Sequence, residues 1–308
     1  MRNFRKTSSK KMFAEFANEL ASQLRTLGRY RTSETYLSAA RSFLAFNRGR
    51  DMLLSDITSD TILHYEAFLM NERHVKRNSS SFYMRIMRSI YNKAVSKRLV
   101  ADNKPFDFVY TGIDKTVKRA LPMSDMRRII DSDLSRHPRL CKARDIFLFS
   151  FYTRGMSFVD IAFLKKSDLR NGVLEYYRRK TGQRLCIKWE RCMQDIIDKH
   201  GTGIDDYLMP IIINKNIDAY KQYTNALSNI NLALKRISVK LNLRRPLTMY
   251  VARHSWASIA KSKNIPISVI SEGMGHDSEA TTQIYLSSIE ASVIDRANRM
   301  IIKSLLGK

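Results

Sequence analysis

Three kinds of side chain in the last third of the sequence could carry out phosphate chemistry together. Arg253 stands beside His254, His276 follows a Met-Gly pair, and Tyr285 lies nine residues further on. An arginine fork matches phosphate oxygens and keeps its charge, a histidine donates a hydrogen bond or handles a proton, and a phenol can attack phosphorus as a covalent nucleophile. Such a set suits metal-free cleavage of a phosphodiester, in which fixed donors stabilise the transition state.

A basic turn upstream offers an acid for the same reaction. Residues Val173 to Arg178 and Arg184 to Trp189 alternate in polarity around a short turn that contains Gly182, which predicts a β-hairpin. Lys180 lies in this turn, where its ammonium group could protonate a departing oxygen. A plain basic surface hairpin is the alternative interpretation.

Three short motifs resemble the C-terminal signature of tyrosine recombinases, the phage integrase family: Arg253-His254, Met274-Gly275-His276 and Thr281-Thr282-Gln283-Ile284-Tyr285. The resemblance extends roughly from residue 10 to the end and is nearest to recombinases of Bacteroides-type bacteria. It implies that Arg253 is the family's second arginine, His276 its third-box histidine and Tyr285 its nucleophile. It also implies that Lys180 is the lysine of the family's catalytic hairpin.

Two positions depart from the family pattern. The slot of the first arginine falls on Ser157, and Arg154 lies three residues earlier, about one helical turn away. We expect Arg154 to fill this role and Asp160, at the position of the family acid, to support it. Tyr250 replaces the histidine of the His-x-x-Arg box; a phenol can donate a hydrogen bond to phosphate but carries protons poorly at neutral pH.

Helical periodicity dominates the elements that must position these residues. We expect a basic tail over residues 1–10, a helical DNA-binding domain over 11–100, a linker over 101–122 and a catalytic domain over 123–308. The predicted fold class is mainly α with a small β-hairpin or sheet. The resemblance implies a SAM-like core-binding domain, a tyrosine recombinase catalytic domain, and a C-terminal helix that docks in trans on a neighbouring protomer.

The charge balance favours an anionic partner. Lysine and arginine number 54 against 29 acidic residues, which gives a net charge of +25. Double-stranded DNA is the partner that we expect, and a merely soluble or ribosome-like basic protein is the alternative. A helix from about Ser79 to Lys97 concentrates cations and small hydroxyls. The residues that we expect to contact phosphate there, if this is not just a solvated face, are Arg77, Asn78, Ser79, Ser80, Arg85, Arg88 and Lys93.

Other classes of protein find little support. The three cysteines are odd in number and lack CxxC spacing, and no apolar run reaches membrane-spanning length. We therefore expect a bacterial cytoplasmic, nucleoid-associated protein without a membrane partner. The sequence holds no glycine-rich phosphate loop, HExxH motif or paired-carboxylate cluster, so we expect neither a cofactor nor a metal site.

The resemblance implies a complete reaction. Tyr285 would attack a scissile phosphate, leave a 3′-phosphotyrosyl bond, and pass strands through a Holliday junction within a homotetramer on two specific recombination sites. Accessory DNA-bending proteins are candidate partners. Because the chain begins almost directly with the core-binding domain, we favour DNA inversion, with integration, excision and Xer-like resolution left open. A tyrosine-type topoisomerase and a catalytically impaired DNA-binding accessory protein are the alternatives.

Overall fold

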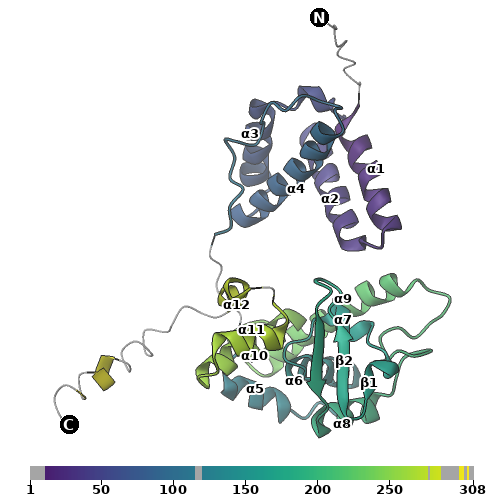
Figure 1. Cartoon of the computed structure of the whole chain (residues 1–308), viewed down its shortest axis with the longest axis vertical. Coiled ribbons are helices and arrows are strands. Elements are labelled where there is room, and N and C mark those ends of the chain that lie inside the picture. Colours follow the sequence, from purple (N-terminus) through teal and green to yellow (C-terminus); the bar gives the residue numbers. More distant parts are fainter. Residues whose placement is uncertain (1–10, 115–119, 277, 286–297, 302–303, 305–308) are drawn as a thin grey trace, which may run out of the picture. The chain divides into compact units, whose positions relative to one another are not determined.

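The computed structural model describes residues 11–114, 120–276, 278–285, 298–301 and 304 (Figure 1). The chain divides into two compact units, Met1–Thr116 and Val117–Lys308. Helices dominate both units and one small antiparallel sheet lies in the second, so the predicted fold class is confirmed. None of the helices in the described ranges is both long enough and apolar enough to cross a bilayer.

The first unit is a helical bundle. Its elements are α1 (Phe13–Thr26), α2 (Tyr30–Phe46), η1 (Leu54–Asp56), α3 (Ser59–Ala67), η2 (Phe68–Glu72) and α4 (Arg77–Ser96). Apolar residues recur at helical spacing, and their aromatic rings meet in the core. Phe43 contacts Phe13 and Tyr65 edge-on, at centroid distances of 5.1 and 5.2 Å. This core fixes the direction of α4 and therefore of its basic face.

The segment expected to begin the linker packs against α4. Phe106 and Val109 are buried in the core of the first unit. Ser81 Oγ donates to Gly112 O at 2.5 Å, and Asn78 exchanges two hydrogen bonds with the backbone of Asp114, at 2.7 and 3.0 Å. Residues 101–114 therefore extend the first unit, and the five residues that follow lie outside the described ranges.

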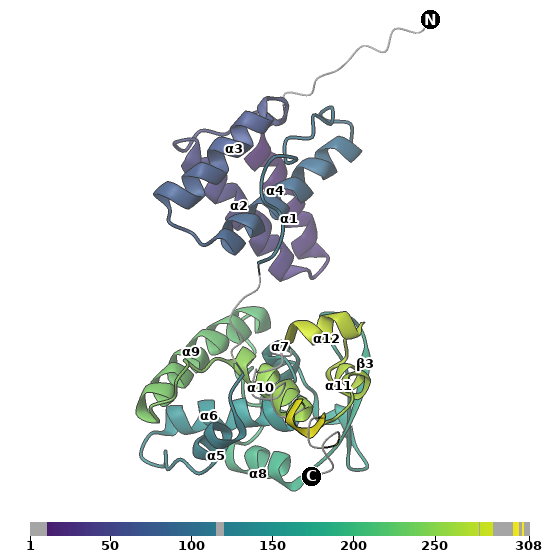
Figure 2. The same ribbon diagram turned by 90° about the vertical axis from the view of Figure 1, so that its left-hand side faces the viewer.

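One buried helix lies at the centre of the second unit. Its helices are α5 (Met123–Ile130), α6 (Pro138–Tyr152), α7 (Phe158–Ala162), η3 (Lys166–Asp168), α8 (Arg191–His200), α9 (Ala219–Lys240), α10 (Met249–Ser262), α11 (Ile267–Met274) and α12 (Glu279–Tyr285). Helix α6 contacts α8, α9 and α10 (Figure 2). Ile146, Phe147 and Phe149 point to different sides of α6 and are all buried, as expected for a core helix.

The sheet carries the turn with Lys180. Strands β1 (Leu169–Arg170), β2 (Val173–Tyr177) and β3 (Arg184–Lys188) pair in sequence order, all antiparallel. Val173 pairs with Lys188 and Tyr177 with Arg184, so the expected hairpin is confirmed, with each strand ending one residue earlier than predicted. The short strand β1 was not predicted.

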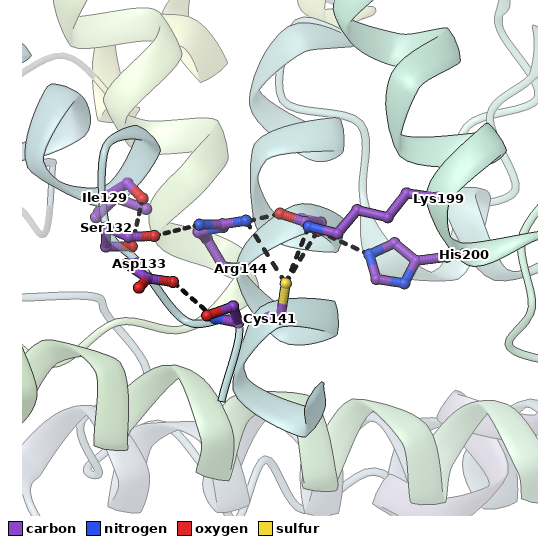
Figure 3. Close-up of polar contacts among 9 residues, drawn as sticks. Ile129, Ser132, Asp133, Cys141, Arg144, Lys199 and His200 are labelled. Atoms are coloured by element: carbon purple, nitrogen blue, oxygen red, sulfur yellow. Dashed lines mark hydrogen bonds and ion pairs between the residues drawn. The ribbon is translucent and has the colours of Figure 1, made fainter. Parts of the chain in front are cut away.

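A buried carboxylate ties α6 to the end of α8. Asp145 accepts hydrogen bonds from Arg144 at 2.8 Å, Lys199 at 2.8 Å and His200 at 2.7 Å. Figure 3 shows the side chains of Arg144, Lys199 and His200 converging from the two helices. Burial raises the pKa of Asp145, but hydrogen bonds from Lys199, Arg144 and His200 outweigh it and hold that pKa below its ordinary value. The cluster fixes α6, and Arg154 follows two residues after the last residue of this helix, Tyr152.

The predicted C-terminal helix lies largely outside the described residues. Met300 and Ile301 are described and exposed. The trans docking of this helix therefore stays a prediction.

Candidate active site

Arg253 is the buried centre of the site. It lies on α10, and only 6% of it is exposed. Its Nη1 donates to Gly155 O at 2.8 Å, and its Nη2 donates to Met274 O at 2.7 Å. These bonds join the loop after α6, helix α10 and the end of α11, so the guanidinium is fixed in orientation before any ligand binds.

Gly155 allows this close approach. Its φ is +75°, in the left-handed region, and a Cβ there would lie 2.7 Å from Arg253 Cα. Both facts favour glycine, because other residues lose free energy at such a φ and no side chain fits against a backbone atom at that distance.

His276 completes the buried pair. Its Nε2 lies 2.8 Å from Arg253 Nη2, and its Nδ1 lies 2.7 Å from Thr282 Oγ1. Burial, followed by the charges of neighbouring cations, lowers the pKa of His276 to about 4. A ring with this pKa is neutral at pH 7, so the proton handling considered from the sequence is disfavoured and hydrogen bonding is left as its role.

Ser157, at the position where the family has its first arginine, has a different function here. Ser157 caps α7, and its hydroxyl donates to Asp160 Oδ2 at 2.6 Å. The other carboxylate oxygen of Asp160 accepts from the backbone N–H of Arg179 at 2.9 Å. Ser157 and Asp160 thus hold the hairpin next to Lys180, which gives the expected supporting role of Asp160 a physical basis.

Arg154 lies beside this centre. Its φ of +59° is unusual for a residue with a side chain. Its side chain packs next to Gly273 of α11: a Cβ added to that glycine would lie 3.6 Å from Arg154 Cδ. Within the described part of the chain, its half-buried guanidinium has neither a hydrogen bond nor an ion pair, so it is available to an anion.

Two residues of the hairpin were not singled out from the sequence. Arg178 is buried, and its Nη1 donates to Gly275 O. Burial raises the pKa of Tyr176, while the charges of Arg253, Arg178 and Arg154 act in the opposite direction, so all three lie within electrostatic reach of this ring. The sequence did carry a signal for Arg178. Side chains of a strand alternate between its two faces, so the buried face of β2 that holds Tyr176 continues to Arg178, two residues later.

The remaining candidates have different surroundings. Lys180 is exposed in the hairpin turn, and its charge acts on His276. Tyr250, 52% exposed, packs edge-on against His254 with the ring centroids 4.4 Å apart. Tyr285 is the last residue of α12, and its side chain lies outside what the structure describes.

Comparison with known families decides the identity. The model described as "Phage integrase SAM-like domain" matches residues 12–110, and that described as "Phage integrase family" matches residues 126–291. The chain belongs to the phage integrase family. It is a site-specific DNA recombinase of the tyrosine type.

Relatives along most of the chain agree. A tyrosine recombinase of Pseudothermotoga lettingae is 20% identical over 285 residues, which cover 88% of this chain and 92% of the relative. Tyrosine recombinase XerD of Pseudomonas aeruginosa is 22% identical over 274 residues, 86% of this chain and 89% of XerD.

Solved integrase structures share the fold. A lambda integrase dimer bound to a core site has a TM-score of 0.65 at 16% identity, covering 91% of this chain and 78% of that one. The Tn1549 transposon integrase in complex with a circular intermediate DNA has a TM-score of 0.65 at 17% identity, covering 94% of this chain and all of that one.

The SAM-like unit of this recombinase has a basic hollow on α4. Its lining combines three expected phosphate contacts with two residues that sequence reasoning missed: Arg85, Arg88, Lys93, Ser89 and Asn92. These positions follow helical spacing and form one face. Helical periodicity could have included Ser89 and Asn92, because they lie between the expected cations.

The start of α4 is used within the protein instead. Arg77 stacks on the Tyr110 ring at 3.8 Å, and both hydrogen-bonding atoms of the Asn78 amide bind Asp114. Ser80 is buried, which disfavours phosphate contact, whereas Ser79 is exposed. The hollow is therefore a better candidate for DNA contact than the N-terminus of α4.

Proposed function

We propose that this recombinase cuts DNA through Tyr285, whose phenol attacks the scissile phosphorus. The P–O5′ bond breaks, a 3′-phosphotyrosyl bond forms and a 5′ hydroxyl leaves. The observation that carries the proposal is the buried Arg253–His276 pair, which hydrogen-bonds to the helix that ends at Tyr285. An arginine preorganised in this way stabilises developing phosphate charge without reorganising during the reaction.

Each remaining residue has a proposed task. Arg154 binds a phosphate oxygen as the second guanidinium, which is supported by its having no hydrogen bond or ion pair to another described residue. Lys180 protonates the departing 5′ oxygen from its exposed turn, since an ammonium group is a proton donor at neutral pH. Tyr250 and Ser157 act as supporting residues, the latter through Asp160.

The proposed partner is double-stranded DNA carrying specific recombination sites. Arg85, Arg88 and Lys93 contact its backbone from α4, and the net charge of +25 supports this assignment. A lambda integrase tetramer has been solved on a Holliday junction, with a TM-score of 0.65 to this chain. By analogy we propose a homotetramer that exchanges strands on two sites, with the C-terminal helix docked in trans.

We propose inversion or integration and excision of DNA as the biological outcome. The fold likeness to the Tn1549 transposon integrase favours integration and excision. The genes that flank the bound sites decide between the two outcomes.

A trapping experiment tests the proposed chemistry. The protein is mixed with genomic DNA of its source, denatured, and the covalently attached fragments are sequenced. We expect fragments joined through their 3′ ends that share a short repeat. Tyr285→Phe should form no covalent complex yet bind DNA within about twofold of wild type, because only one hydroxyl is lost. Tyr177→Phe, an exposed tyrosine of the same unit, is the control. Covalent complexes with Tyr285→Phe would show that another residue is the nucleophile.

A further inference from the structure

A fully buried hydroxyl connects α12 to the active site. Thr282 is 0% exposed, and its Oγ1 lies 2.7 Å from His276 Nδ1. Tyr285 follows one turn later in the same helix. The path from the proposed nucleophile's helix to Arg253 therefore runs through two hydrogen bonds, one at each nitrogen of the His276 ring.

The chemistry of arginine fixes the direction of both bonds. A guanidinium only donates, so His276 Nε2 must accept the hydrogen bond from Arg253 Nη2 and carries no proton. The neutral ring then holds its single proton on Nδ1, which donates to Thr282 Oγ1. The hydroxyl of Thr282 thus accepts the Nδ1 proton of the tautomer that Arg253 requires, so this buried N–H is not left without a partner.

Within the described ranges, the adjacent threonine has no such connection. Thr281 is half-buried, and its hydroxyl lies 3.2 Å from Ser278 Oγ at the start of α12. This is a local contact at a helix N-terminus. The two neighbours have the same side chain, but only Thr282 is hydrogen-bonded to the Arg253–His276 pair.

We propose that Thr282 is a positioning residue for recombination. Its hydroxyl accepts the hydrogen bond from His276 Nδ1, orients the ring toward Arg253, and so holds α12 at a set distance from Arg253. The inference rests on the proposed function, because this distance matters to the reaction only if Arg253 and Tyr285 act on the same phosphate.

Three variants separate the hydrogen bond from the space that the side chain fills. Thr282→Val keeps the shape and removes the acceptor, and we expect covalent complex formation to slow roughly tenfold to hundredfold at unchanged DNA affinity. Thr282→Ser restores the hydroxyl and should recover most of the rate. Thr281→Val is the matched control and should stay within about twofold of wild type. A wild-type rate for Thr282→Val would overturn the proposal.

The protonation of the two His276 ring nitrogens can be measured directly, and it would not depend on the Thr282 hydroxyl if Thr282 only filled space. In 15N-labelled protein without DNA, protonated and unprotonated ring nitrogens differ widely in chemical shift. The signals of His276 are identified among the six histidines by their loss in His276→Asn. We expect the proton on Nδ1 in wild type and in Thr282→Ser. In Thr282→Val we expect a displaced Nδ1 signal, because that N–H loses its acceptor while Arg253 still donates to Nε2.

The two experiments test the role of Thr282 and the proposed function independently. A wild-type ring protonated at Nε2 would overturn the role of Thr282, even if Thr282→Val proved too unstable to assay. If wild type forms no covalent complex, the proposed function fails, while the tautomer measurement still decides whether Thr282 orients His276.

Discussion

Gly155→Ala should damage the active site from a position that holds no charged group. The new Cβ would lie 2.7 Å from Arg253 Cα and 2.9 Å from its Cγ. A backbone atom cannot move aside as the end of a side chain can, so the loop after α6 and helix α10 must separate. That separation would break the hydrogen bond from Arg253 to Gly155 O.

The cost has two parts. A left-handed φ of +75° costs an alanine about 1–2 kcal/mol, and the overpacking adds about 1–3 kcal/mol. The sum of about 2–5 kcal/mol should lower the Tm of the catalytic unit by about 5–15 °C. Displacement of Arg253 should slow covalent complex formation about 100- to 1,000-fold, the scale of a removed transition-state donor.

Gly172→Ala is the matched control. Gly172 has a φ of +73° in the same unit, and nothing lies within 4 Å of its added Cβ. It should therefore show the cost of φ alone and keep the wild-type cleavage rate. The assays are thermal unfolding and the trapping reaction, each with both variants. The reasoning is refuted if Gly155→Ala has the same Tm as Gly172→Ala and cleaves DNA at the wild-type rate.

Two further predictions concern Asp145 of α6 and the residues between α6 and α7. Because the pKa of Asp145 is held below its ordinary value, its stabilisation is present above about pH 4 and is lost as pH falls through the folded-state pKa. Asp145→Asn should cost about 3–5 kcal/mol at pH 7 and less at pH 3; urea unfolding that gives equal differences at both pH values would contradict this. Arg154→Ala should abolish cleavage at nearly unchanged stability, whereas Ser157→Ala should lower it only a few-fold through Asp160, and the reverse order in the trapping assay would assign the phosphate contact to Ser157.

Local patterns in the sequence were sufficient for the fold class, and the resemblance to the family supplied most of the proposed catalytic set. Two-residue alternation predicted the hairpin at β2 and β3, and a left-handed Gly275 ends α11 directly before His276. The spacing of Arg253, His276 and Tyr285 depends on short loops between consecutive helices. These features follow from neighbours in the chain, which is why they can be read without the fold.

The fate of the polar groups was decided only by the tertiary structure. Asn78 was expected to bind phosphate, but a returning segment engages its amide at Asp114, 36 residues away. Ser157 binds Asp160, and Arg253 binds Gly155 across 98 residues of sequence. A residue's type fixes which hydrogen bonds it can make, but packing selects its partners and its exposure. The sequence by itself therefore determined the family, the fold class and the proposed reactive groups, and the tertiary structure decided which of those groups are held within the protein and which are left available to a ligand.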